Sequence, residues 1–157
     1  MIEWMDHVGI VVDDLTAATE FFVALGLELR DEAAPVEGRW VDRVVGLDGV
    51  RMDIAVVQTP DGHGRLELTK FHTPVSQDGG GPAPANTRGI RHVAFRVDDI
   101  HAAVAGLRAR GAELVGEVVC FEDAFLLCYV RGPEGIIVEL TAQVINPAVP
   151  AGPPRIN

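Results

Sequence analysis

Two histidines and two glutamates, placed at matching positions of an internal repeat, are the residues of this chain best suited to hold a metal ion. They are His7, Glu67, His92 and Glu139. Their imidazole nitrogens and carboxylate oxygens make a set of two nitrogen and two oxygen donors, which suits a divalent first-row metal. A single His or Glu at a strand end is usually a solvated surface residue, so the metal hypothesis depends on the repeat.

The repeat relates the two halves of the chain. Residues 6–29 match residues 91–114 without a gap at an offset of 85, which places His7 over His92. Residues 66–69 match residues 138–141 at an offset of 72, which places Glu67 over Glu139. The two offsets differ by 13 residues, so we expect an insertion of that size between residues 35 and 53. Duplication is the simplest explanation of such a match.

Each half is predicted to contain a strand, a helix and three further strands. The first strands alternate apolar residues and end at a pair of aspartates that can cap a helix, and a glycine follows each helix. The ranges predicted for the first half are a strand at 7–12, a helix at 15–25 and strands at 28–33, 51–58 and 65–71. Those for the second half are a strand at 92–97, a helix at 100–110 and strands at 113–118, 124–131 and 136–142. The inserted residues 40–47 are predicted to form a short helix or turn. The fold class is therefore α+β, with two tandem modules.

Strand alternation predicts where the four candidate ligands point. Side chains on a strand alternate between its two faces, so Glu67 lies opposite Leu66 and Leu68, and each histidine lies opposite the apolar side of its strand. Small residues accompany the candidates on the same faces, as an open cavity would require. They are Gly9, Thr69, Ala94 and Thr141. A two-fold arrangement of the halves would bring the four candidates to one point.

Composition limits the class of partner. The chain has 157 residues and a formal net charge of -10, and Lys70 is its single lysine. This acidic balance argues against binding to nucleic acid or to an anionic membrane surface. No apolar run approaches the roughly 20 residues of a membrane helix, and the first residues carry acid where a signal peptide carries base. We therefore expect a cytoplasmic protein that binds a small molecule. Cys120 and Cys128 are expected to be small buried hydrophobes.

The predicted domain plan has one domain at residues 4–143. Module one covers residues 4–72, a glycine- and proline-rich linker covers 73–89, and module two covers 90–143. Residues 144–157 contain four prolines from residue 146 onward and are expected to form an extended tail.

Over about residues 4–143 the chain resembles the vicinal oxygen chelate superfamily, which includes glyoxalase I, methylmalonyl-CoA epimerase, extradiol dioxygenases and the bleomycin and fosfomycin resistance proteins. Four segments carry the resemblance: DHVGIVVDDL from residue 6, RLEL from 65, RHVAFRVDDI from 91 and GPEGIIVEL from 132. It implies paired βαβββ modules whose sheets curl around a metal held by His7, Glu67, His92 and Glu139. This ligand pattern matches glyoxalase I at all four positions.

The resemblance implies a metal-dependent lyase or isomerase of the glyoxalase I type. In that chemistry a divalent metal, here Ni, Co, Zn, Mn or Fe, stabilises an enediolate while a carboxylate moves the proton beside a carbonyl. Glu139 is the preferred base and Glu67 its counterpart, because a ligand carboxylate that detaches from the metal can accept a proton. A homodimer is also implied, with modules paired either within a chain or across chains.

Three alternatives remain open at this point. An acyl thioester epimerase resembling methylmalonyl-CoA epimerase usually has Gln where this chain has Glu67, and a single lysine makes a poor cradle for CoA phosphates. A non-catalytic binder would hold a natural product in the same cavity. An extradiol dioxygenase would use only one carboxylate. Glu37 lies near the position of an extra base in the epimerases but is predicted to be solvated. His72 lies at the end of a predicted strand and has no partner in the repeat; it is not expected to take part in the site, and a role in a pocket is the alternative.

Overall fold

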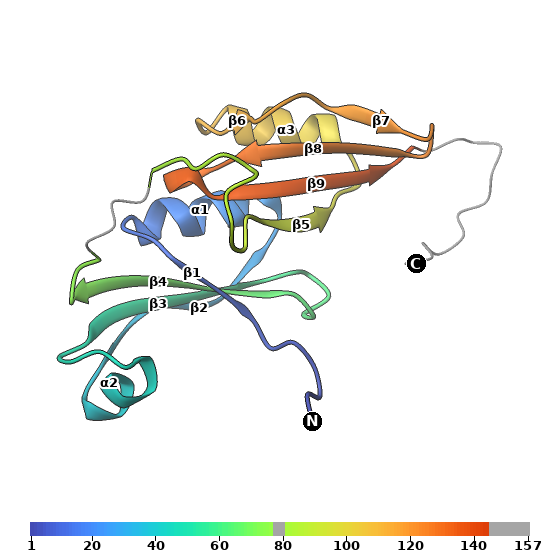
Figure 1. Cartoon of the computed structure of the whole chain (residues 1–157). Coiled ribbons are helices and arrows are strands. Elements are labelled where there is room, and N and C mark those ends of the chain that lie inside the picture. Colours follow the sequence, from blue (N-terminus) through green and yellow to red (C-terminus); the bar gives the residue numbers. More distant parts are fainter. Residues whose placement is uncertain (77–80, 145–157) are drawn as a thin grey trace.

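The computed structural model describes residues 1–76 and 81–144. Its first half contains six elements (Figure 1). In chain order they are β1 (Val8–Val11), α1 (Leu15–Leu25), β2 (Glu28–Glu37), α2 (Arg39–Val45), β3 (Arg51–Gln58) and β4 (Arg65–Thr73). The four strands form one sheet in the order β1-β4-β3-β2, in which β1 runs parallel to β4 and the other neighbours are antiparallel.

The second half repeats this plan. Its elements are β5 (His92–Arg96), α3 (Ile100–Arg108), β6 (Glu113–Leu114), β7 (Val119–Phe121), β8 (Phe125–Arg131), a 3-10 turn at Pro133–Gly135 and β9 (Ile137–Gln143). The sheet order is β5-β9-β8-β6, and β7 also pairs with β8. The predicted α+β class is confirmed, and so is the order of strand, helix and three strands in the first half, apart from the inserted α2. In the second half, only Glu113–Leu114 of the strand predicted at 113–118 is a strand, and β7 is a further strand outside the predicted ranges. In the described part of the chain, the two sheets remain separate, with β1 and β5 at their edges, and a cavity of about 370 Å³ is lined by residues of both strands.

The helix starts follow the prediction from the paired aspartates. The carboxylate of Asp14 accepts a hydrogen bond from the Ala17 N–H at 2.9 Å, and Asp99 caps α3 in the same way. Gly26 ends α1 with a φ of 113°, a left-handed conformation that glycine adopts without steric cost. In the second half the helix ends earlier than predicted, at Arg108, and Gly111 takes its positive φ two residues after the cap.

The insertion extends the first sheet. Strand β2 continues past the predicted residue 33 to Glu37, and Pro35 is tolerated because β2 is the edge strand and needs no partner on its outer side. The short helix predicted at 40–47 is confirmed as α2. Its Val41 packs with Val50 and Met52 in a small apolar cluster apart from the main core.

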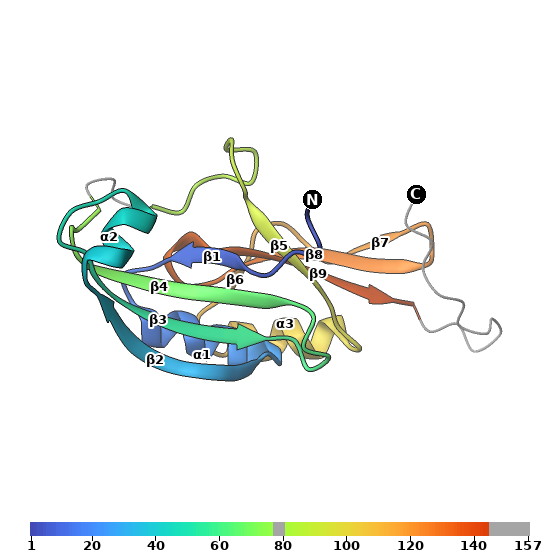
Figure 2. The same ribbon diagram turned by 90° about the horizontal axis from the view of Figure 1, so that it is seen from below.

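One hydrophobic core joins both halves. Helix α1 packs on the first sheet, α3 packs on the second, and the two helices contact each other. Figure 1 shows α1 between the two sheets, and Figure 2 shows α1 and α3 along the same side of the molecule. The ring of Phe22, which is fully buried, meets Phe95 of β5 edge to face at 6.3 Å. The helices therefore form a layer that both sheets share.

A polar contact holds the start of α1 against the turn before β9. The carboxylate of Glu134 accepts hydrogen bonds from the backbone N–H groups of Asp13 and Asp14 at 2.6–2.9 Å. Next to it, Gly132 leaves room for the ring of Phe21, because a Cβ at this position would lie 2.7 Å from the ring. This contact and the shared core fix the two halves relative to each other.

Two predicted segments include residues that the structure does not describe. Of the tail predicted at 144–157, only Val144 belongs to the described residues. Of the linker predicted at 73–89, residues 77–80 lie outside them. Within residues 1–76 and 81–144, no helix is long and apolar enough to cross a membrane.

Candidate metal site

The first candidate pair lies on the parallel strands β1 and β4. His7 immediately precedes β1, and Glu67 on β4 pairs in register with Gly9, two residues after the histidine. The Nε2 atom of His7 lies 3.8 Å from Oε2 of Glu67. A Cβ at Gly9 would meet no atom within 4 Å, so the space beside the pair is open.

The second pair repeats this geometry on β5 and β9. His92 begins β5, and Glu139 on β9 pairs in register with Ala94, again two residues after the histidine. The Nε2 atom of His92 lies 3.2 Å from Oε2 of Glu139. The same register in both modules places each imidazole beside the carboxylate of its own half.

Burial confirms the predicted faces of the strands. Leu68 on β4 and Leu140 on β9 are fully buried in the core, whereas the neighbouring Glu67 and Glu139 are partly exposed. Because the core lies on the helix side of each sheet, both His–Glu pairs lie on the side away from the shared helices. Each pair therefore faces outward from its own sheet.

The four candidates form two pairs rather than one group. Among the residues that the structure describes, no three or more His, Cys, Asp or Glu side chains come close enough to share one metal ion. The physical reason is the shared helix layer, which keeps the outward faces of the two sheets apart within a chain (Figure 1). Each face carries half of an N2O2 donor set.

The environment of His7 suits a metal ligand. Its Nδ1 lies 2.8 Å from Oδ2 of Asp6, which leaves Nε2 directed at Glu67. A carboxylate on the second ring nitrogen fixes the tautomer and orientation of a ligating imidazole. This hydrogen bond, together with the nearby charge of Arg65, keeps the pKa of the exposed Asp6 carboxyl below its usual value.

Other residues on the outward face of the second sheet were not predicted from the sequence. The ring of Tyr129 on β8 lies 4.9 Å from the ring of His92. On the neighbouring strands β8 and β9, Tyr129 stands directly opposite Glu139. Further along the same face, Arg96 donates a hydrogen bond to the side-chain oxygen of Gln143 at 2.7 Å. Alternation along β8 could have identified Tyr129, because it shares the parity of Leu127 rather than that of the buried Cys128.

Both outward faces are hollowed. On the first, a cavity of about 380 Å³ is lined by Val11, Leu47, Phe71 and the segment after β4. On the second, a cavity of about 410 Å³ includes Glu139 and Tyr129 in its lining. A small molecule therefore has space beside Glu139, whereas the cavity on the first face lies further along the sheet and is not lined by His7 or Glu67.

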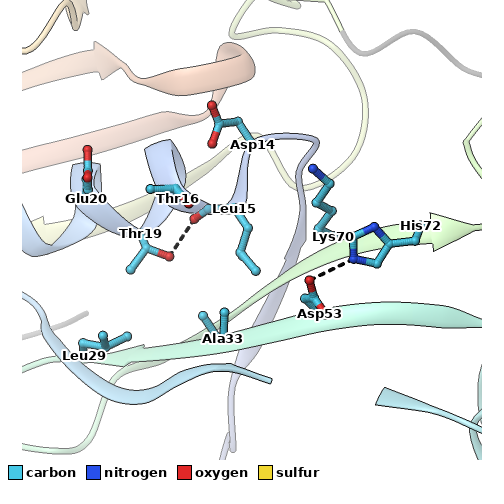
Figure 3. A pocket seen from close by; sticks show the side chains of 11 residues that line it. Asp14, Leu15, Thr16, Thr19, Glu20, Leu29, Ala33, Asp53, Lys70 and His72 are labelled. Atoms are coloured by element: carbon cyan, nitrogen blue, oxygen red, sulfur yellow. Dashed lines mark hydrogen bonds and ion pairs between the residues drawn. The ribbon is translucent and has the colours of Figure 1, made fainter. Parts of the chain in front are cut away.

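The structure also places the two cysteines and two other residues considered from the sequence, Glu37 and His72. Cys120 is exposed, which corrects the expectation that both cysteines are buried, because it lies on the short outer strand β7 that no layer covers. Cys128 is buried as expected, and both are free thiols. Glu37 is exposed and lies 3.5 Å from Arg51, as predicted for a solvated residue. His72 lies in a different cavity on the helix side of the first sheet (Figure 3).

Known proteins resemble this chain both in sequence and in structure. A family model described as the glyoxalase/bleomycin resistance protein/dioxygenase superfamily matches residues 4–140. The crystal structure of a glyoxalase family protein from Bacillus cereus is 45% identical, with a TM-score of 0.88 and coverage of 92% of this chain and 96% of that one. An uncharacterised protein of Bacillus subtilis, YwbC, is 25% identical over 88% of this chain and 97% of its own length.

The fold is also shared with a fosfomycin resistance protein, FosX, from Listeria monocytogenes. The two chains are 15% identical, with a TM-score of 0.55 and coverage of 92% of this chain and 96% of that one. The FosX structure was solved in complex with Mn(II) and a sulfate ion. At this level of identity the likeness concerns the fold alone.

Proposed function

The chain belongs to the glyoxalase/bleomycin resistance protein/dioxygenase superfamily, and on that premise we propose that it is a divalent-metal-dependent lyase or isomerase acting on a small molecule. Its metal ligands would be His7, Glu67, His92 and Glu139. The observation that carries the proposal is the shared register of the two His–Glu pairs, in which each glutamate stands opposite the second residue after its histidine.

The donor chemistry fits a divalent cation. Two neutral imidazoles and two carboxylates give an N2O2 set that Mn²⁺, Fe²⁺, Co²⁺, Ni²⁺ and Zn²⁺ all accept. The contact between Asp6 and His7 adds the kind of outer support that such sites use. The Mn(II) complex of FosX makes Mn²⁺ the first metal to test.

We infer further that two copies of the chain complete each site. The His7–Glu67 pair of one copy would meet the His92–Glu139 pair of another, because the shared helix layer keeps the two pairs of a single chain apart. Strands β1 and β5 both end their sheets and so offer unpaired edges for such an approach. Exposed apolar residues on or beside the outward faces, such as Val11 and Val119, would be covered. The proposed assembly is a homodimer with two equivalent sites, and the proposed compartment is the cytoplasm.

The two carboxylates differ in how firmly they are held. The Thr69 hydroxyl lies 3.5 Å from Oε1 of Glu67 and donates to it, whereas the close contact of Glu139 is with Nε2 of His92 at 3.2 Å. Glu139 is also the less exposed of the two, at 23% against 33%. Glu139 lines the cavity of about 410 Å³ on its face and Glu67 does not, so Glu139 is the proposed base and Glu67 the fixed ligand.

The proposed reaction moves a proton beside a carbonyl group. A bound divalent cation supplies Lewis-acid polarisation of neighbouring substrate oxygens. Glu139 takes the proton from the substrate carbon and returns it to the adjacent position. Tyr129, which stacks on His92, forms one wall of the cavity in which the substrate carbon must lie next to Glu139.

Metal analysis and two assays test the proposal. Purified protein loaded with Mn²⁺, Co²⁺, Ni²⁺ or Zn²⁺ should retain one metal per chain after gel filtration, and Glu139→Gln should abolish turnover. Turnover of the methylglyoxal–glutathione hemithioacetal supports the lyase, whereas turnover of methylmalonyl-CoA favours the epimerase. If the protein retains no divalent metal, and His7→Ala does not change the binding of these substrates, the proposal of an enzyme is wrong and the chain is a metal-free binding protein. Glu113→Gln, on the exposed strand β6, is the matched control.

A further inference from the structure

Another cavity lies on the opposite side of the first sheet from the His–Glu pair. It has a volume of about 360 Å³ and lies between the start of α1 and strands β2, β3 and β4. Its strand residues Asp53, Ala55 and Lys70 share the helix-facing side of the sheet with the buried Leu68. This cavity is therefore separate from the proposed metal site.

A histidine and the single lysine of the chain lie at one end of this cavity. Lys70 and His72 are two residues apart on β4, so their side chains lie on the same face of the strand. Nε2 of His72 lies 2.8 Å from Oδ2 of Asp53 on the neighbouring strand. Figure 3 shows the Lys70 side chain extending toward the start of α1, with Leu29 and Glu20 toward the other end of the cavity. Among the described residues, no carboxylate lies within ion-pairing distance of the Lys70 ammonium.

The internal repeat provides a built-in comparison for these positions. In the second module the residues equivalent to Asp53 and Lys70 are Leu126 and Ala142, which pair in the same register. Thr19 of α1 corresponds to Val104 of α3 at the offset of 85. The three residues of the second module belong to or pack against the hydrophobic core. The second module therefore fills with apolar side chains the space that the first module lines with polar ones.

This contrast points to a ligand. A charged residue in place of a core residue costs stability, and such local exceptions concentrate at functional sites. We propose that the cavity binds a short aliphatic hydroxy acid. The ligand carboxylate pairs with the Lys70 ammonium, its hydroxyl hydrogen-bonds to His72, and its chain lies on Leu29, Ala33 and Ala55.

The tautomer of His72 decides the hydroxyl contact. Asp53 accepts a hydrogen bond from the Nε2–H group, so the neutral ring presents Nδ1 as an acceptor. A hydroxyl group can donate to this atom, whereas a second carboxylate oxygen cannot. One carboxylate and one hydroxyl therefore match the two polar groups better than two anionic groups do.

The remaining charges limit the ligand to one negative charge. Asp14 and Glu20 also line the cavity, and both repel an anion. The backbone N–H groups of Asp13 and Asp14 are already occupied by Glu134, and that of Ala17 by Asp14. A phosphate usually relies on such N–H groups or on several basic side chains, so this cavity disfavours phosphates.

Because Lys70 is the single lysine, the NMR signal of its labelled methyl groups reports directly on ligand binding in this cavity. Reductive methylation with ¹³C-formaldehyde labels only Lys70 and the N-terminal amine of Met1, and both keep their positive charge. Addition of 3-hydroxyhexanoate should shift the Lys70 methyl signal saturably and leave the Met1 signal in place. Hexanoate, which lacks the hydroxyl, should bind about fivefold more weakly. Hexane-1,3-diol, which lacks the carboxylate, should give no saturable shift.

A variant that copies the second module tests whether the polar lining matters. The double substitution Thr19→Val with Asp53→Leu retains Lys70 and uses residues that the same fold already accommodates. It should keep its melting temperature within a few degrees and weaken 3-hydroxyhexanoate binding at least about tenfold. Arg110→Gln, outside the cavity, should change nothing. Equal shifts with the acid and the diol, an unsaturable shift, or full binding by the folded double variant would each overturn the proposal.

Discussion

Nδ1 of His7 lies 2.8 Å from Oδ2 of Asp6, the residue immediately before it. This contact assigns one ring nitrogen to a carboxylate and leaves the other for Glu67, which is 3.8 Å away. The two modules support their histidines differently, because His92 has an aromatic neighbour, Tyr129, and no such carboxylate among the described residues. The proposed metal site is therefore symmetric in its ligands but asymmetric in what surrounds them.

Replacing Asp6 with Asn tests this support. Loss of the carboxylate removes the group that orients the ring, so the affinity for Co²⁺ should fall by about 10–100-fold. Competition with a chromophoric chelator measures that affinity without any need for a substrate. Asp61→Asn, in an exposed turn remote in sequence, is the matched control. An unchanged affinity in Asp6→Asn would show that the hydrogen bond does not serve a metal ligand.

Two glycines, one at a turn and one inside a helix, should respond in opposite directions to alanine. At Gly132 a Cβ would lie 2.7 Å from the buried ring of Phe21, so Gly132→Ala should cost about 1–3 kcal/mol of unfolding free energy. At Gly106, inside α3, a Cβ meets no atom within 4 Å, so Gly106→Ala should stabilise by about 0.5–1 kcal/mol. Urea unfolding measures both, and a stable Gly132→Ala variant would contradict the packing of α1 against the turn.

Glu134 should contribute to the stability of the whole chain although it is exposed. Its carboxylate accepts from two backbone N–H groups at the start of α1, and hydrogen bonds to charged groups contribute more than neutral ones. Glu134→Ala should therefore lower the unfolding free energy by about 1–3 kcal/mol in urea titrations. Glu117→Ala, on the exposed segment before β7, should change it little. Equal values for the two variants would mean that the contact does not hold the halves together.

The two cysteines should react at different rates. Cys120 is exposed, whereas burial raises the pKa of the Cys128 thiol and disfavours the reactive thiolate. At pH 8 iodoacetamide should alkylate Cys120 at least about tenfold faster than Cys128, as peptide mass spectrometry would show. In urea the two rates should become similar. Equal rates in the folded protein would contradict the buried position of Cys128.

Local features of this fold were predictable from the sequence. The bounds of α1, both aspartate caps and the faces of Glu67 and Glu139 follow from short-range alternation and from cap chemistry. The repeat then identified the four candidate ligands, because it showed that two distant His–Glu pairs occupy equivalent positions.

The arrangement of the two sheets was not predictable in the same way. It depends on the packing of α1 against α3, which strand alternation does not encode. The extension of β2 through Pro35 depends on its place at the sheet edge, and the exposure of Cys120 depends on the absence of a layer over β7. The sequence assigned His72 a pocket role only as an alternative and did not connect it with Asp53, because the two residues lie on different strands and the equivalent of Asp53 in the second module is the apolar Leu126.

A mixing experiment tests the central claim that the two His–Glu pairs of different copies make one metal site. One variant carries His7→Ala and Glu67→Ala, and the other carries His92→Ala and Glu139→Ala. Each alone should retain no Co²⁺ after gel filtration. The heterodimer, co-expressed with two different tags and purified on both, regains one complete donor set, so it should retain one Co²⁺ per dimer. A heterodimer without Co²⁺, or two chains that never associate, would contradict the account.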